Sequence, residues 1–273
     1  MVNTFERGAV HSFRGQTWRT AGGVAEPAWR EVPQEAAIGL SYDSRPYVVV
    51  MGTPADLEDL AVGFTVTERI AAFADIERVT LSQSSHGLTA DVLLSRRAGK
   101  AMDVARRRTL EARSSCGLCG VESLRDAVRP MARLAAGLRI SRRAIQSALA
   151  ALEEGQALGA RTRATHAAAW ARADGEVVLV REDVGRHNAL DKLVGAALRA
   201  GLDPAASFIL ITSRCSYEMV EKTAAAGVAV LAAISAPTAL AIEQAQGAGM
   251  TLIALARADG HSVFTGAERI IEG

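Results

Sequence analysis

The chain has 273 residues, of which 49% are hydrophobic and 22% charged, and this is the composition of a globular protein with one large or two small domains. The formal net charge of +1 gives no bulk electrostatic reason to expect nucleic acid or a membrane as a partner. Because there is no signal peptide pattern, no apolar run of membrane-spanning length and no disulfide framework among the three cysteines, we expect a cytoplasmic protein with reduced thiols.

The first third of the chain predicts an arm followed by an α+β domain. Residues 1–33 are polar and show no hydrophobic period, which is typical of an arm or a loosely packed start. Residues 34–112 contain two apolar runs around a Tyr-Asp-Ser-Arg-Pro turn, and alternating runs on both sides of Ser-His-Gly, so they predict two hairpins. A helix is predicted between the hairpins by the spacing of Leu57, Leu60, Phe64 and Ile70.

Residues 113–164 predict a cysteine loop and a helical connector. Cys116 and Cys119 stand three positions apart, each followed by a glycine. A helix is expected after them, because Val121, Leu124 and Val128 recur at helical spacing, and Pro130 would end it. A second helix is predicted from an N-cap at Ser141 to a stop at Gly155 or Gly159.

The last part of the chain, residues 165–273, predicts an α/β domain. Four apolar strand runs, "VVLV", "FILIT", "VAVLAAI" and "TLIALA", alternate with helical stretches. This alternation indicates a mainly parallel sheet covered by helices. The whole chain is therefore expected to be α/β with an α+β N-terminal part.

Polar residues gather in the loops that follow these strands, and such loops meet at one edge of a parallel sheet. In the first two loops they are Arg186, His187, Asn188, Ser213, Arg214 and Ser216. Two arginines beside helix N-termini suit an anion, most naturally phosphate. The alternative is that Asn188 and Ser216 only cap helices and that the arginines form surface ion pairs. Neither G-x-G-x-x-G nor G-x-x-x-x-G-K-[ST] occurs, which disfavours an ordinary NAD enzyme or a P-loop NTPase.

Three kinds of chemistry are open to the cysteine pair. A zinc site needs four ligands, and no second closely spaced pair exists to supply them, so we expect no permanent metal. A helix start and the arginines upstream would favour the thiolate of Cys116, which could carry sulfur as a persulfide. Cys119 could then attack that persulfide and release the sulfur. These residues do not separate a sulfur carrier from a dithiol oxidoreductase, or from a nucleotide-binding module whose cysteines hold a metal across a dimer.

Three stretches together resemble the FdhD family, the accessory sulfurtransferases of formate dehydrogenase: "SSCGLCGVE", "THAAAW" followed by "REDVGRHNALDKLVGAAL", and "SRCSYEMVEKTAAAGVAVLAAISAPTALA". The resemblance implies a sulfur carrier that takes persulfide sulfur from a cysteine desulfurase. It implies delivery to the molybdenum cofactor, bis-molybdopterin guanine dinucleotide, which formate dehydrogenase requires. It places the persulfide on Cys116, with Cys119 as the second cysteine of the pair.

The same resemblance implies further properties of the C-terminal part. It places cofactor contacts on Leu255, Ala256, Arg257, Ala258, Asp259 and Gly260. It also implies a homodimer and a cytidine-deaminase-like fold. Deaminase chemistry is not expected, because the H-x-E and P-C-x-x-C motifs of the zinc deaminases are absent. The sequence does not indicate a role for Cys215 or His166.

Overall fold

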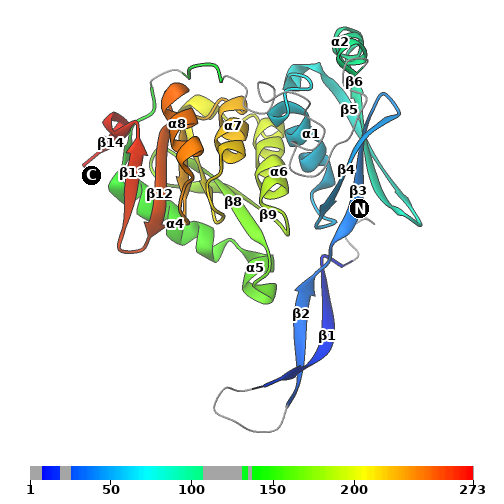
Figure 1. Ribbon diagram of the computed structural model, residues 1–273, viewed down its shortest axis with the longest axis horizontal. Coiled ribbons are helices and arrows are strands. Elements are labelled where there is room, and N and C mark those ends of the chain that lie inside the picture. Colours follow the sequence, from blue (N-terminus) through cyan, green and yellow to red (C-terminus); the bar gives the residue numbers. More distant parts are fainter. Residues whose placement is uncertain (1–7, 19–25, 107–130, 135–136, 273) are drawn as a thin grey trace.

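The computed structural model describes residues 8–18, 26–106, 131–134 and 137–272, and these form a mixed α/β fold (Figure 1). Cys116, Cys119 and the helix predicted after them lie outside the described residues. The described strands make a six-stranded sheet, a four-stranded sheet and two small two-stranded sheets. Within these ranges no helix has both the length and the apolar character needed to span a membrane.

The N-terminal arm is a long antiparallel hairpin of β1 (Val10–Thr17) and β2 (Glu26–Pro33), which projects beyond the rest of the chain (Figure 1). The arm was predicted, but its strands were not. Both faces of the hairpin are open to solvent, and Phe13 and Trp29 are exposed on opposite faces. The alternation of apolar and polar residues that marks a half-buried strand is therefore missing. A bidentate contact of Arg161 with Glu31 joins the arm to helix α5 (Ala157–Thr162).

The two predicted hairpins are confirmed and form the four-stranded sheet. They are β3 (Ala36–Tyr42) with β4 (Arg45–Gly52), and β5 (Ile76–Ser84) with β6 (Gly87–Leu94), joined by a parallel pairing of β3 with β6. The predicted helix is α1 (Leu57–Thr67), and it packs on one face of this sheet. A 3-10 turn η1 (Phe73–Asp75) precedes β5, and α2 (Arg96–Arg106) follows β6.

The six-stranded sheet corrects one prediction, because it is mixed. Its order is β13-β12-β11-β10-β8-β9, and three of the five pairings are antiparallel. The strands are β8 (His166–Arg172), β9 (Val177–Asp183), β10 (Ser207–Ile211), β11 (Val230–Ala233), β12 (Thr251–Arg257) and β13 (Gly260–Thr265). The four predicted strands, β9 to β12, do run in one direction. The prediction was wrong because β8 and β13 were not foreseen and both run against them.

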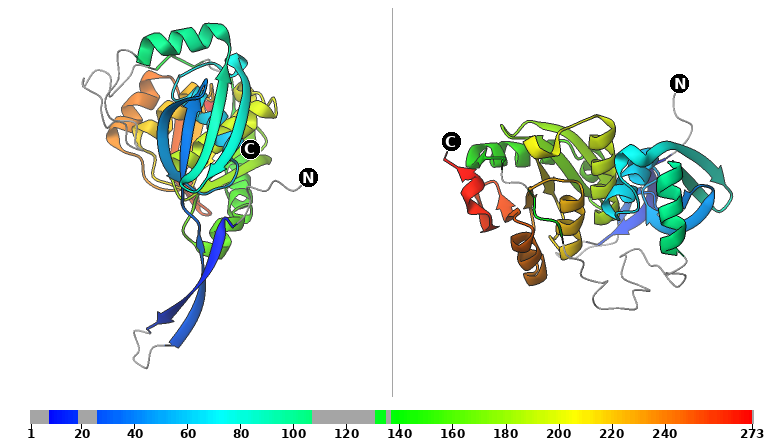
Figure 2. Two further views of the ribbon diagram at one scale, coloured as in Figure 1. Left: turned by 90° about the vertical axis from the view of Figure 1, so that its right-hand side faces the viewer. Right: turned by 90° about the horizontal axis from the view of Figure 1, so that it is seen from above.

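Helices cover both faces of this sheet (Figures 1 and 2). Helices α6 (Arg186–Arg199), α7 (Tyr217–Ala225) and α8 (Ala239–Gly247) share one core with it. On the other face lies α4 (Arg142–Glu154), which comes from the predicted connector. Its predicted N-cap is confirmed, because Ser141 Oγ accepts a hydrogen bond of 3.0 Å from Ala144 N. The remaining elements are η2 (Pro204–Ala206), η3 (Ala267–Arg269), and the parallel pair β7 (Ile140–Ser141) and β14 (Ile270–Ile271).

The two halves of the chain meet where α1 crosses α6. The helices touch through glycines: a Cβ on Gly63 would lie 1.7 Å from the Asp191 carbonyl oxygen, and one on Gly195 would lie 1.9 Å from the Asp59 carbonyl oxygen. Only residues without a side chain permit so close an approach. The β4–α1 turn of the first half is thereby held against the start of α6 in the second.

Candidate functional site

The strand ends of the six-stranded sheet gather the predicted site residues along one edge. Strands β9 to β12 all end there, and the loops that follow, taken together with the adjoining residues of the strands and helices, span residues 183–188, 212–216, 234–238 and 255–260. We call these loops the carboxyl edge. The antiparallel β8 begins at the same edge, so His166 lies opposite Asp183. The loops are linked, because Cys215 N donates to Ala236 O at 3.2 Å and Leu255 N donates to Ser235 O at 3.2 Å.

The loop between β9 and α6 is fixed from inside the protein. Helix α6 begins at Arg186 with Gly185 as its N-cap, so the predicted cap at Asn188 is wrong. The Asn188 amide donates instead to Met51 O at 2.8 Å and to Asp183 Oδ1 at 3.0 Å. Asn188 is buried, and its amide nitrogen is engaged in these internal contacts. The loop therefore presents Arg186 and His187 to the edge rather than Asn188.

Three predicted site residues carry buried polar atoms without a hydrogen-bond partner. Within the described ranges such atoms are Arg186 Nε, His187 Nε2, Ser216 Oγ, Trp170 Nε1 and Arg269 Nε. Buried polar groups in folded proteins are almost always hydrogen-bonded, so an unused group needs an explanation. The first three lie at the starts of α6 and α7, where backbone N–H groups are also unused by the helix. This part of the edge is therefore suited to an anionic or hydrogen-bonding ligand.

His166 and His187, which both lie at this edge, are neutral at physiological pH. Burial lowers the pKa of His187 to about 4, and the charges of Arg186 and Lys222 act in the same direction. Burial and then Arg186 also lower the pKa of His166, although Asp183 acts against them. Positive charge at the edge consequently comes from arginine, and the imidazoles offer hydrogen bonds without charge.

In the segment predicted to contact the cofactor, the backbone is unusual at one residue. Leu255 has a φ of 53°, and the pairing of β12 with β13 shifts register between Ala254 and Arg257. A non-glycine residue in the left-handed region is strained, and such strain often accompanies function. The irregularity leaves the Leu255 side chain 45% exposed, while Ala256 faces the core. Arg257 donates to Ile234 O, and Ala258 and Asp259 are exposed in the turn before Gly260.

The second loop divides its residues between the surface and the interior. Arg214 is exposed, whereas Ser213 is buried and donates to Arg214 O at 3.1 Å. Ser216 is the predicted N-cap of α7, but its hydroxyl accepts no capping hydrogen bond. Cys215 is completely buried, and burial raises the pKa of its thiol to about 12. A thiol that is neither accessible nor ionised is a poor nucleophile, so the buried Cys215 is unsuited to sulfur chemistry.

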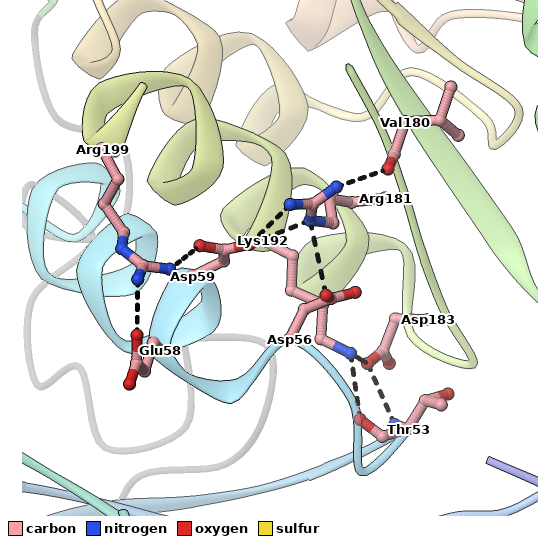
Figure 3. A network of polar contacts seen from close by, with 9 residues as sticks. All are labelled: Thr53, Asp56, Glu58, Asp59, Val180, Arg181, Asp183, Lys192 and Arg199. Carbon is pink, nitrogen blue, oxygen red and sulfur yellow. Dashed lines mark hydrogen bonds and ion pairs between the residues drawn. The ribbon is translucent and has the colours of Figure 1, made fainter. Parts of the chain in front are cut away.

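A cluster of buried polar groups behind the edge was not predicted. It consists of Thr53, Asp183, Asn188 and Lys192, and we call it the Asp183 cluster. Figure 3 shows three of its members, Thr53, Asp183 and Lys192. One signal in the sequence could have revealed it. Lys192 stands between Leu190 and Leu193 in a helix whose inner face is apolar, and a charge at such a position needs a buried partner. Among the residues that the structure describes, no group of three or more His, Cys, Asp and Glu is arranged to hold a metal ion.

Comparison with known proteins identifies relatives that match almost the whole chain. The model of the FdhD/NarQ family matches residues 33–271. The chain is 44% identical to the sulfur carrier protein FdhD of Cupriavidus necator over 263 residues, covering 96% of this chain and 90% of that protein. It is 44% identical to the protein of the same name from Agrobacterium fabrum, covering 89% and 90%. A crystal structure from Desulfotalea psychrophila, provisionally described as a formate dehydrogenase accessory protein, superposes with a TM-score of 0.78 at 23% identity, covering 96% of this chain and all of that one. At that identity the superposition supports the fold alone.

Proposed function

Since the chain belongs to the FdhD/NarQ family, we propose that it is a sulfur carrier that takes persulfide sulfur from a cysteine desulfurase and delivers it to the molybdenum cofactor of formate dehydrogenase. The observation that carries the proposal is the match with relatives named sulfur carrier proteins, which extends over almost the whole chain. The cysteine pair lies within residues 33–271, the range that the family model matches. Cys116 accepts the sulfur and Cys119 assists its release.

The sulfur carrier works in two chemical steps, the loading of sulfur onto Cys116 and its release by Cys119. In loading, the Cys116 thiolate attacks the terminal sulfur of the donor's persulfide, and the donor leaves as a thiolate. In release, the Cys119 thiolate attacks the Cys116 sulfur and expels the outer sulfur as hydrosulfide. The outer sulfur gains two electrons, and a Cys116–Cys119 disulfide forms. A cellular dithiol reductant then returns the pair to thiols for another cycle.

The chemistry of the carboxyl edge supports the proposal that the substrate bears a nucleotide. The molybdenum cofactor carries phosphates and guanines, which suit Arg186, the unused Ser216 hydroxyl and two helix N-termini. Strands β9 and β12 stand four places apart in the sheet. At about 4.8 Å for each place, the ends of the edge are separated by about 19 Å, which a single phosphate cannot span and an extended dinucleotide can.

Mass spectrometry of the full-length protein after incubation with cysteine and a desulfurase tests the proposal. We expect the mass to rise by one sulfur atom, and we expect Cys116→Ala to abolish this increase. Cys215→Ala is the matched control, because the buried Cys215 thiol takes no part and its loss leaves sulfur uptake intact. Bound zinc in the purified protein, or a redox-active disulfide without any sulfur uptake, would instead favour a metal-holding module or a dithiol oxidoreductase.

The buried thiol of Cys215 is expected to resist an alkylating reagent. In a variant with Cys116 and Cys119 replaced by serine, we expect iodoacetamide at pH 8 to leave the native protein unlabelled. Burial and the raised pKa of Cys215 both protect it. Labelling after unfolding in guanidinium chloride provides the positive control. Rapid labelling of the native variant would show that Cys215 is accessible and would reopen its role.

Three further properties of the protein are predictions. They are a homodimer, a cytoplasmic location, and a cytidine-deaminase-like topology for the C-terminal part. Size-exclusion chromatography with light scattering would test the homodimer, in which the cofactor site could include residues from both copies.

A further inference from the structure

We propose that Asp183 is the positioning residue of the anion-binding part of the carboxyl edge, and that Lys192 and Thr53 hold it in place. The inference rests on the proposed function, because it concerns how the nucleotide-bearing substrate is received. Asp183 itself does not touch that substrate. It fixes the loop that carries Arg186 and His187.

The contacts of Asp183 account for the shape of this loop. Its carboxylate is completely buried and accepts hydrogen bonds from Gly185 N at 2.8 Å and from Thr53 N at 2.9 Å. It also accepts from Asn188 Nδ2 at 3.0 Å and from Lys192 Nζ at 2.6 Å. Two of these donors, Gly185 and Asn188, flank Arg186 and His187. The carboxylate therefore ties down the loop on both sides of the proposed site residues.

The cluster also connects the loop to the other half of the chain (Figure 3). Lys192 Nζ donates to the carbonyl oxygen of Thr53 at 2.9 Å, and Thr53 Oγ1 accepts from Val184 N at 3.1 Å. Thr53 lies in the turn between β4 and α1. Each polar group of Thr53 thus contacts the loop, Asp183 or Lys192, and the four-stranded sheet supports the edge of the six-stranded one.

The buried polar atoms that lack a partner favour a functional role for the Asp183 cluster over a purely structural one. Arg186 Nε and His187 Nε2 have no partner within the described residues, so these side chains do not themselves hold the loop. A buried ion pair is weak support for stability, because removing two charges from water offsets much of their attraction. The Asp183–Lys192 pair is best explained as a means of setting the loop before the ligand arrives, which reduces the ordering that binding would require.

The experiment measures guanosine diphosphate binding by calorimetry and sulfur uptake at Cys116 by mass spectrometry, in the full chain. We expect Asp183→Asn to weaken nucleotide binding by about tenfold or more, because a site displaced by as little as 1 Å loses much of its interaction energy. Thr53→Val removes one hydroxyl and keeps the charges, so we expect it to fold even if Asp183→Asn does not. For it we expect a loss of roughly threefold to tenfold, corresponding to one hydrogen bond. Sulfur uptake at Cys116 should stay unchanged in both variants.

The matched control is Arg199→Gln, which removes an ion pair with Asp59 at the same junction of the two halves but away from the loop. We expect it to lower the melting temperature and to leave nucleotide affinity unchanged. If Thr53→Val binds the nucleotide as the wild type does, the inference is wrong while the proposed function stands. If affinity falls in the control as much as in the two loop variants, the cluster is merely structural. A wild-type protein that takes up sulfur but binds no nucleotide would overturn both the inference and the proposed route of delivery.

Discussion

At the scale of single residues, His187 makes the stability of the protein depend on pH. Burial, Arg186 and Lys222 lower its pKa to about 4, whereas the ordinary value is 6.5. Between these values the unfolded chain binds a proton that the folded chain refuses. Stability is therefore complete above pH 6.5 and falls as the pH drops toward 4, by up to about 1.4 kcal/mol for each pH unit.

Asp191 acts in the opposite direction over part of this range, so a matched comparison is needed. Burial raises its pKa to about 6, although Lys222 and Thr67 oppose this, and its protonation on acidification favours the folded state. The variant His187→Gln keeps Asp191 and removes only the histidine. We expect the wild type to lose stability relative to this variant between pH 6.5 and 4.5, measured by urea unfolding at several pH values. Parallel curves would show that His187 titrates normally.

Lys222 shows why a buried charge can be retained next to this histidine. Its ammonium group donates to both carboxylate oxygens of Asp191 at 2.9 Å and to Glu68 at 2.8 Å. Desolvation alone would lower the pKa of Lys222, but Asp191 and Glu68 outweigh it and raise it to about 12. At neutral pH the lysine is therefore charged and His187 is not. The difference follows from the partners, because the carboxylates surround Lys222 while the nearest charges to His187 include two cations.

At the scale of elements, the crossing of α1 and α6 depends on two glycines. The side chain of Gly63→Ala would come within 1.7 Å of the Asp191 carbonyl oxygen, and backbone atoms cannot move aside as a flexible side chain would. The helices would have to separate, and we expect a loss of about 3 kcal/mol or more in the free energy of unfolding. Gly195→Ala should behave in the same way, since its nearest backbone oxygen would lie at 1.9 Å.

Gly247→Ala is the control for this prediction. Gly247 is the last residue of α8, and an added Cβ there would meet no atom within 4 Å. Alanine is the better helix former, so this variant should be neutral or more stable by up to about 1 kcal/mol. Guanidinium chloride unfolding of the three variants measures both effects. Equal stability of Gly63→Ala and Gly247→Ala would mean that the two helices do not approach as described.

Elements with a buried face could be predicted from the sequence, and elements without one could not. The hairpins of the four-stranded sheet each bury one side, and helix α1 turns its large apolar residues toward that sheet, so the apolar residues recur with the period of the structure. The hairpin of β1 and β2 buries neither side and leaves no such pattern. Strand β8 was missed because its centre is a run of alanines, which fits a strand buried on both faces but is not typical of one.

At the scale of the molecule, strand direction brought the predicted site residues together. Arg186, Ser216 and Leu255 stand far apart in the sequence, yet each lies near the carboxyl end of a strand of the same direction, so all of them belong to the carboxyl edge. The rule that parallel strands end at one edge made this predictable. The Asp183 cluster was not predictable in this way. It depends on how the β4–α1 turn of one half meets α6 of the other. The sequence indicates only that Lys192 needs a buried partner, and it does not identify Asp183 or Thr53 as that partner.

The junction of the two halves leads to a prediction about unfolding. Asp59 on α1 is buried, and its carboxylate accepts from Arg181 at 2.9 Å and also contacts Arg199. Together with the glycine crossing and the buried lysines, this interface resembles the interior of one domain more than a contact between two. We expect the protein to unfold in a single transition, with equal calorimetric and van't Hoff enthalpies.

The variant Asp59→Asn tests how strongly the junction couples the two halves. It weakens charged hydrogen bonds of about 2 kcal/mol in total, and should lower the melting temperature by about 5 °C. The transition should stay single, because the glycine contact and the Asp183 cluster still join the halves. Differential scanning calorimetry measures both quantities. Two separate transitions in the wild type would show that the halves fold independently, and a split that appears only in Asp59→Asn would mean that the Asp59 ion pairs alone hold them together.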